Sequence, residues 1–114
     1  MIDLLAQIPL GWSSVEVHQV DERVAPDGHP DRNASLLERF PRGTTVHPMP
    51  VTAADLRRAA NRYARSLPAR LDVVHLGLGD DGHTASWPPD DPVVASARPV
   101  EVTAEFHGRQ RMTL

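Results

Sequence analysis

The sequence predicts an α/β fold built on an open, mostly parallel sheet flanked by helices. Three observations support this prediction. Residues 15–20 (VEVHQV) alternate apolar and polar side chains as a strand does, and residues 53–67 place apolar side chains at helical spacing. Residues 71–76 (LDVVHL) then form an almost continuous apolar run. Strand, helix and strand in this order are typical of parallel strands covered by helices on both faces.

Length and composition narrow the possible functions. A chain of 114 residues forms a single domain, here 1–114, and its net charge of -3 gives no general attraction to nucleic acid or anionic membranes. It contains no cysteine, which excludes disulfides and thiol chemistry, and all 12 basic residues are arginine, which excludes a Schiff-base lysine. Because no signal peptide or membrane-spanning run is visible, we expect a soluble cytoplasmic protein.

The N-terminal half carries three predicted elements. Residues 2–8 favour a short helical turn, and 15–20 a strand that ends at the acidic and basic tripeptide 21–23 (DER). Residues 25–31 contain two prolines and an Asp-Gly pair, so we expect an irregular loop. Asn33 is placed to cap a helix that continues to about Phe40.

The middle of the chain holds the clearest helix. Residues 46–51 are extended and interrupted by proline, and Thr52 is the candidate N-cap of a helix over 53–67. Its apolar side recurs at i, i+4, i+7 and i+11, and consists of Leu56, Ala60, Tyr63 and Leu67. The apolar run 71–76 follows as a strand, in which we expect His75 to be a core residue. Residues 109–114 close the chain as the start of another strand.

Glycines and charged residues follow the apolar run directly. Residues 77–82 (GLGDDG) match the G-x-G-x-x-G fingerprint of dinucleotide-binding proteins. In that fingerprint a helix N-terminus faces a pyrophosphate, whereas here Asp80 and Asp81 would repel phosphate and Pro88 and Pro89 block a long helix. Dinucleotide binding is therefore a minor alternative.

An acid–base site is the better interpretation of this loop. The glycines allow a sharp turn that brings Asp81 and His83 to its rim, where the histidine acts as a general base and the carboxylate orients it. In a parallel sheet the DER tripeptide at 21–23 lies at the same edge. The histidines show neither H-x-H nor H-x-x-x-H spacing, so the sequence gives no support for a metal site.

These segments resemble the 6-phosphogluconolactonase family, which shares its fold with the glucosamine-6-phosphate deaminases. The resemblance is carried by VHQVDERVAP at 17–26 with DRNA at 31–34, by DVVHLGLGDDGHTASWPP at 72–89, and by RMTL at 111–114. It implies a Rossmann-like sheet of the sugar-phosphate isomerase and lactonase type. It also implies that this chain corresponds to a truncated central portion of a longer protein, incomplete at both ends.

The resemblance further implies hydrolysis of 6-phospho-D-glucono-1,5-lactone to 6-phosphogluconate in the pentose phosphate pathway, without a cofactor or metal. The catalytic residues would be His83 as the base that activates water, Asp81 as its positioning group and Arg23 as the group that stabilises negative charge. Residues implied to bind the substrate are Asp21, Glu22, Gly79, Gly82 and Thr84. In the deaminase relatives a glutamate follows the histidine by five residues, and Pro88 takes that place here.

Two alternatives to a working lactonase remain at this stage. One is a non-catalytic remnant or interaction domain of the same family, and the other is the dinucleotide-binding domain. We expect a phosphosugar lactone as the small-molecule partner, with neither nucleic acid nor membrane. Self-association through exposed sheet edges is also expected, because an open edge presents unpaired backbone groups. Four arginines are candidates for the phosphate: Arg23, Arg42, Arg109 and Arg111.

Overall fold

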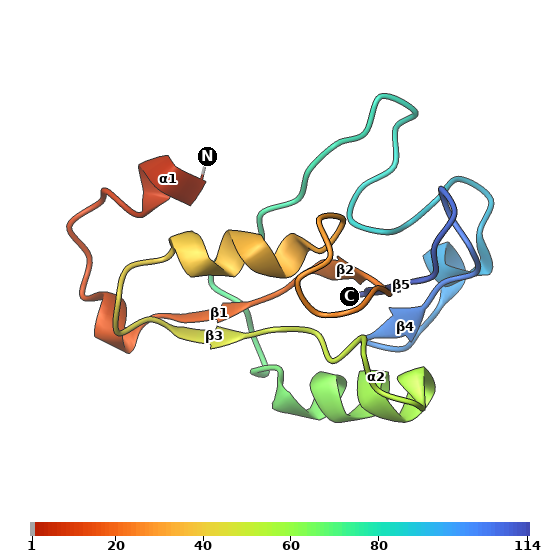
Figure 1. Cartoon of the computed structure of the whole chain (residues 1–114), viewed down its shortest axis with the longest axis horizontal. Coiled ribbons are helices and arrows are strands. Elements are labelled where there is room, and N and C mark those ends of the chain that lie inside the picture. Colours follow the sequence, from red (N-terminus) through yellow and green to blue (C-terminus); the bar gives the residue numbers. More distant parts are fainter. Residues whose placement is uncertain (1) are drawn as a thin grey trace.

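The computed structural model describes residues 2–114 and contains short helices and strands joined by long loops (Figure 1). In chain order the elements are α1 (Ile2–Leu5), the 3-10 helix η1 (Trp12–Ser14), β1 (Glu16–His18), β2 (Asp21–Arg23), the 3-10 helix η2 (Asn33–Arg39), β3 (Thr45–His47), α2 (Leu56–Ser66), the 3-10 helix η3 (Pro92–Ala95), β4 (Glu101–Val102) and β5 (Arg111–Thr113). The α/β class expected from the sequence is confirmed: a parallel strand pair is accompanied by helices.

Strands β1 and β3 form the parallel pair. Val17 lies opposite Val46 and His18 opposite His47, and in Figure 1 the pair runs between η2 and α2. Tyr63 of α2 fixes the helix to the end of this pair, because its buried hydroxyl contacts the backbone oxygens of Gln19 and His47, each at 3.0 Å. Burial raises the pKa of this phenol, so it remains a hydrogen-bond donor at neutral pH.

Strands β2, β5 and β4 form an antiparallel sheet in that spatial order. Its central strand β5 is the predicted strand near the end of the chain, and all its residues are buried. Met112 lies opposite Glu22 on one side and Val102 on the other. The hydrophobic core gathers around this strand and α2, and its fully buried members are Met49, Val51, Ala59, Ala60, Tyr63, Val100 and Met112.

A buried glutamate joins these parts. Glu22 has no exposed surface, and one of its oxygens accepts hydrogen bonds from the backbone N–H of Arg23 at 2.8 Å and of Asn33 at 2.7 Å. The other oxygen accepts from Ala34 N–H at 2.9 Å and from the Gln19 amide at 3.0 Å, and it forms an ion pair with Arg32 at 2.9 Å. The carboxylate thus caps η2 and anchors it to β2.

Both predicted helix caps are wrong in detail. Helix α2 begins at Leu56, and its N-cap is Asp55, whose carboxylate accepts a hydrogen bond from Arg58 N–H at 2.9 Å, rather than Thr52. Asn33 does not cap η2, because the buried carboxylate of Glu22 already occupies the free N–H groups there. The side-chain amide of Asn33 donates instead to the backbone and side-chain oxygens of Asp21.

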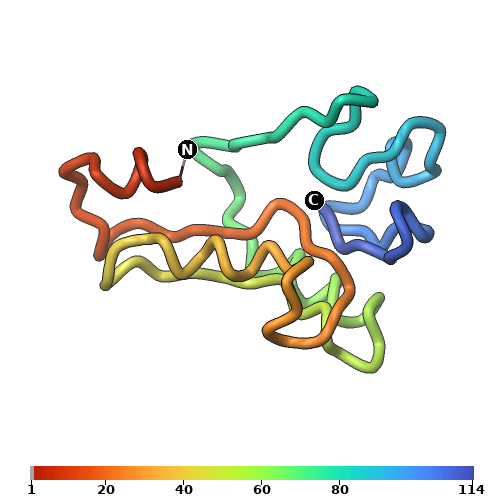
Figure 2. Tube along the Cα trace, turned by 45° about the horizontal axis from the view of Figure 1, so that its top comes forward, coloured from red at the N-terminus to blue at the C-terminus, as the bar shows by residue number. Residues whose placement is uncertain are grey.

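The predicted strand at 71–76 is also wrong. These residues have no regular secondary structure, and Val73 and Val74 are 84% and 50% exposed. His75, expected in the core, is exposed as well. An apolar run becomes a strand only where a neighbouring strand supplies hydrogen-bond partners and other layers cover its side chains. Among residues 2–114, no strand pairs with this segment and no layer covers its side chains. Figure 2 shows it as an extended arm that leads away from α2.

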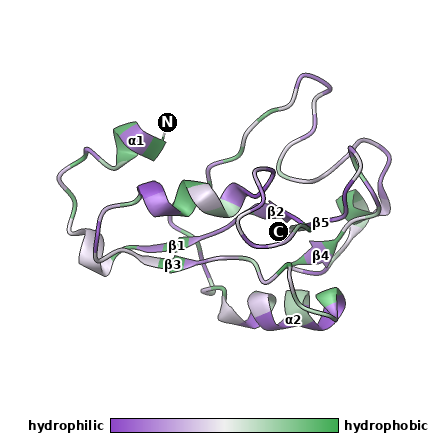
Figure 3. Cartoon of the chain, in the orientation of Figure 1, coloured by the Kyte–Doolittle hydropathy of each residue, from purple (hydrophilic) through white to green (hydrophobic). Residues whose placement is uncertain are grey.

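The N-terminal helix α1 also exposes apolar side chains. Figure 3 shows green, apolar positions in this helix, where Leu4 is 69% exposed, and Ile8 and Leu10 just beyond it are about half exposed. Its ion pair, between Asp3 and Arg39 of η2, is at the surface with N···O of 3.2 Å. Among the helices described within 2–114, none has the length and apolar character needed to cross a membrane.

Replacing Glu22 by glutamine is expected to destabilise the fold strongly. The variant leaves the buried Arg32 guanidinium with only the exposed carboxylate of Asp27 as counter-charge, and the loss of one partner of a buried ion pair typically costs about 3–5 kcal/mol. Urea unfolding followed by circular dichroism measures the change. Asp3→Asn is the matched control at the exposed pair with Arg39, and should lower the free energy of unfolding by less than about 1 kcal/mol. Equal losses in the two variants would contradict the central role of Glu22.

The same carboxylate should make the fold sensitive to acid. Burial on its own would raise the pKa of Glu22, but Arg32 and the other donors outweigh it and hold the pKa below the ordinary value of 4.5. A carboxyl group whose pKa is lower in the folded state than in the unfolded state stabilises the fold fully above the unfolded-state pKa. This stability is lost as pH falls through the folded-state pKa. Urea midpoints measured from neutral pH down to about pH 3 should fall more steeply for the native chain than for Glu22→Gln.

Candidate functional site

The candidate site is built on a tight loop that follows the exposed arm. The loop closes where Leu78 pairs with Thr84 in an antiparallel bridge and Gly79 N–H donates to the His83 carbonyl at 2.8 Å. Gly82 N–H donates back to Gly79, and Gly82 adopts φ +88°, a backbone conformation that side-chain-bearing residues rarely take. The predicted glycine turn is therefore present, although the strand expected before it is not.

This turn presents Asp81 and His83 as a bonded pair. The Asp81 carboxylate lies 2.5 Å from His83 Nδ1 and 3.2 Å from His83 N–H. The hydrogen bonds from His83 lower the pKa of Asp81, so the carboxylate is ionised and Nδ1 carries the proton that it accepts. In the neutral imidazole with this tautomer the lone pair lies on the other ring nitrogen, Nε2, and this is the form that a general base requires.

Gly79 lies directly beneath this pair. A Cβ added to Gly79 would lie 2.3 Å from His83 Nδ1 and Cε1 and 2.8 Å from the Asp81 carboxylate. No side chain fits in that space without moving the imidazole. The glycine at this position is thus required by the close approach of the ring to the backbone.

Two contacts fix the far end of the loop to the antiparallel sheet. The hydroxyl of the fully buried Ser86 donates to the Asp21 carboxylate at 2.8 Å, and Ser86 N–H donates to Thr113 Oγ1 at 3.3 Å. The Trp87 indole donates to the Leu114 carbonyl at 2.6 Å. These contacts bring the loop to β2, which carries the DER tripeptide. The meeting does not occur at the edge of a parallel sheet as the sequence predicted, because β2 belongs to the antiparallel sheet and no strand precedes the loop. Figure 1 shows the C-terminus beside β2 and β5.

Two arginines from neighbouring strands supply positive charge at this edge. Arg23 of β2 lies opposite Arg111 of β5, and burial, together with the charge of Arg23, lowers the pKa of Arg111. Arg23 is held in place because it donates to the Asp31 carbonyl at 2.9 Å and the Asn33 side-chain oxygen at 2.8 Å. Paired guanidinium groups of this kind favour an anion between or beside them.

Phe106 contacts both the His83 imidazole and the Arg111 guanidinium. Its ring lies edge-on to His83, with 5.3 Å between ring centroids, and the Arg111 guanidinium stacks over it at 4.9 Å. Base and cation are therefore separated by one aromatic ring. Phe106 and Ser86 were not among the predicted site residues. Phe106 lies outside the motif, and Ser86, although within residues 72–89, belongs to no pattern that points to its contact with Asp21.

The remaining predicted site residues have varied positions. Asp21 lies between Ser86 and Asn33, and the Thr84 hydroxyl donates to the Gly77 carbonyl at 2.9 Å. Glu22 is enclosed, and both its oxygens are already bonded within the fold. Of the other phosphate candidates, Arg109 is paired with Asp31 at 2.7 Å. A small cavity of about 130 Å³ beside Trp87 and Leu114 does not include His83 or Arg23.

The whole chain, residues 1–114, matches the family model for glucosamine-6-phosphate isomerases/6-phosphogluconolactonase. The chain belongs to this family. The glycine turn with Asp81 and His83 and the DER tripeptide are thus features of a family member, as their resemblance implied.

Similar proteins include curated 6-phosphogluconolactonases from two bacteria. The one from Pseudomonas aeruginosa is 39% identical over 99 residues, which cover 80% of this chain and 42% of the relative. The one from Synechocystis is 32% identical over 131 residues, which cover 99% of this chain and 54% of the relative. This chain therefore spans about half the length of the curated relatives that it matches.

A solved structure confirms the fold. The crystal structure of a 6-phosphogluconolactonase from Shewanella baltica superposes with a TM-score of 0.86 at 24% identity, over 99% of this chain and 54% of that chain. Its Rossmann-like fold agrees with the expected fold class.

Substituting Gly79 by alanine should disrupt the Asp81–His83 pair while leaving the rest of the chain folded, because the new methyl group would overlap the imidazole. Nitrogen-15 NMR of the histidine ring should show the Nδ1 resonance of His83 losing the signature of a strong hydrogen bond. Gly77→Ala is the matched control, since an added Cβ there has nothing within 4 Å. Identical His83 spectra in the two variants would contradict the close packing described for Gly79.

Proposed function

We propose that the chain carries the acid–base half of a lactone-hydrolysing site that acts on 6-phospho-D-glucono-1,5-lactone. The observation that carries the proposal is the Asp81–His83 pair, which the Ser86 contact brings to a sheet edge bearing Arg23. Family membership and the curated relatives named 6-phosphogluconolactonase support the choice of substrate.

In the proposed reaction His83 Nε2 takes a proton from water as the water oxygen attacks the lactone carbonyl carbon. Asp81 holds the ring by its Nδ1–H and stabilises the imidazolium that forms. The tetrahedral intermediate then breaks the bond from the carbonyl carbon to the ring oxygen. That oxygen receives the proton from His83, which yields the open-chain acid and restores the neutral base.

We propose that Arg23 stabilises the negative charge of the substrate or intermediate. Its contacts with Asp31 and Asn33 fix the side chain before substrate arrives, and such preorganisation makes a charged donor effective. The neighbouring Arg111 adds positive potential behind it. These two residues are favoured over Arg109, whose guanidinium is already paired with Asp31.

The other predicted binding residues take supporting roles in this proposal. Asp21 anchors the loop through Ser86, and Gly79 and Gly82 let the turn form beneath the imidazole. Thr84 closes the loop on Gly77. For Glu22, enclosed and fully bonded, we propose a positioning role in place of substrate contact, because it fixes the strand that carries Arg23.

Activity is tested by a coupled assay of 6-phosphogluconate release from the lactone. We expect a rate above the spontaneous background for the native chain, and His83→Ala should lower the catalysed rate by roughly 10²- to 10⁴-fold. Asp81→Asn should act in the same direction, because it removes the charge that stabilises the imidazolium. His75→Ala is the matched control, since His75 is exposed on the arm outside the site.

A native rate no higher than background would overturn the proposal for this chain and favour the alternative of a non-catalytic family member. Equal rates in the native chain, His83→Ala and His75→Ala would exclude His83 as the base.

Arg23→Gln should raise KM or lower kcat without changing the unfolding midpoint. If Arg23→Gln changed the unfolding midpoint but neither KM nor kcat, Arg23 would have no role in the proposed reaction.

A further inference from the structure

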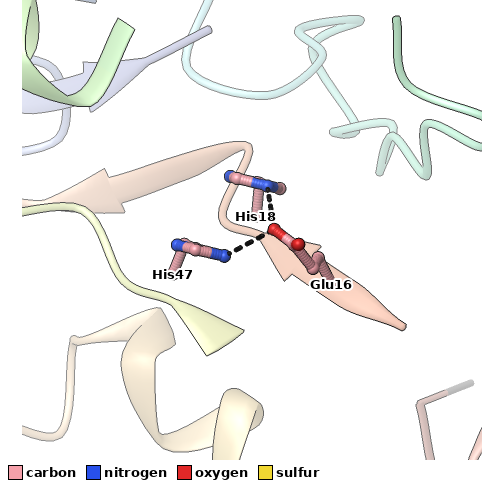
Figure 4. Close-up of side chains that lie close together, drawn as sticks. All are labelled: Glu16, His18 and His47. Atoms are coloured by element: carbon pink, nitrogen blue, oxygen red, sulfur yellow. Dashed lines mark hydrogen bonds and ion pairs between the residues drawn. The ribbon is translucent and has the colours of Figure 1, made fainter. Parts of the chain in front are cut away.

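A second group of polar side chains lies outside the proposed lactone site, on the parallel strand pair. Glu16 and His18 point to the same face of β1, two residues apart, and His47 of β3 lies directly opposite His18 in the register. Figure 4 shows the Glu16 carboxylate beside both imidazoles, with a dashed line from it to each ring. One carboxylate oxygen is 3.0 Å from His47 Nε2 and 3.7 Å from His18 Nε2.

The buried member of the group lacks hydrogen-bond partners. The His18 side chain is only 4% exposed, and neither of its ring nitrogens forms a hydrogen bond within residues 2–114. An imidazole without a partner in the interior is unfavourable, because native proteins pair nearly all their buried polar groups.

The spacing of the donor atoms matches that of metal ligands. One atom from each of the three side chains lies within 4.8 Å of the other two. Two ligands bound to zinc at about 2.1 Å in a tetrahedral arrangement are roughly 3.4 Å apart. The separations of 3.0 and 3.7 Å from the Glu16 oxygen lie on either side of that value.

We propose that Glu16, His18 and His47 form a binding site for a divalent transition-metal ion of the zinc class. Two imidazoles and one carboxylate are a ligand set that zinc accepts, and a fourth position is left for water. The ion would be coordinated by a ring nitrogen of His18, which accepts no hydrogen bond from the described residues.

Exposure of the other two ligands gives the ion a way in. The side chains of Glu16 and His47 are 64% and 30% exposed, so the ion reaches the buried imidazole from solvent. The imidazole rings are stacked in parallel at 4.1 Å, so the partly exposed His47 has to tilt for its lone pair to point at the ion. Tyr63 is not a further ligand, because its hydroxyl is already directed at backbone oxygens.

The position of the site predicts a structural role. Its ligands come from both strands of the parallel pair, so a bound ion would join β1 to β3 by coordination in addition to their short hydrogen-bond ladder. Binding to the folded state alone raises stability in proportion to the logarithm of the ion concentration. The site needs no contribution from His83 or Asp81, which makes it independent of the proposed lactone chemistry.

Calorimetric titration with ZnCl₂ tests the proposal on the native chain, Glu16→Gln, His47→Gln and the control His75→Gln. We expect one zinc ion per native chain, unchanged binding in the control, and at least about tenfold weaker binding in each ligand variant. The thermal unfolding midpoint should rise with zinc in the native chain and the control only. No binding, or equal binding in all four proteins, would overturn the proposal.

NMR of the native chain gives a second readout that no substitution disturbs. At one equivalent of zinc the Nε2 resonances of His18 and His47 should shift, and those of His29, His75, His83 and His107 should not. Shifts confined to His83 would place the ion at the lactone site and overturn the assignment. A titration with MgCl₂ should leave all the imidazole resonances unchanged, because Mg²⁺ prefers oxygen ligands.

Discussion

The structure depends most on the buried carboxylate of Glu22. Its two oxygens collect the N–H groups at the start of η2, the Arg32 guanidinium and the Gln19 side chain. Gln19 in turn accepts a hydrogen bond from Met49 N–H at 2.8 Å, which continues the connection to the chain after β3. One enclosed charge therefore links the parallel pair, the antiparallel sheet and η2. A chain with so small a core gains definition from such a network, because every group in it has one satisfactory position.

That network also explains why the tripeptide at 21–23 is both structural and chemical. Alternate residues of a strand face opposite sides, so Glu22 points into the protein while Asp21 and Arg23 point the other way. Asp21 holds Ser86 and thereby the histidine loop, and Arg23 is oriented by Asn33, whose own N–H is bonded to Glu22. The positions of the base and the cation are consequently set by the same buried group.

The sequence predicted local features well and distant pairings poorly. The α/β class, a strand within 15–20 (β1), a helix within 53–67 (α2) and the turn that joins Asp81 to His83 all follow from short-range patterns, although both elements are shorter than predicted. Thr52 and Asn33 fit the pattern for caps, but Asp55 and the remote Glu22 occupy those N–H groups. Residues 71–76 have strand composition without a neighbouring strand in the described fold. The histidines His18 and His47 have no motif spacing, since only the register of two strands brings them together.

The exposed arm has a consequence for how the base is held. Residues 70–76 form no backbone–backbone hydrogen bonds in the described chain, whereas Ser86 and Trp87 are tied to the antiparallel sheet. In the described chain, the hydrogen bonds that join the loop carrying His83 to the antiparallel sheet are therefore at its downstream end, and Phe106 packs against the imidazole itself. The C-terminal residues near Leu114, although far from His83 in sequence, therefore help to position the loop that carries the base.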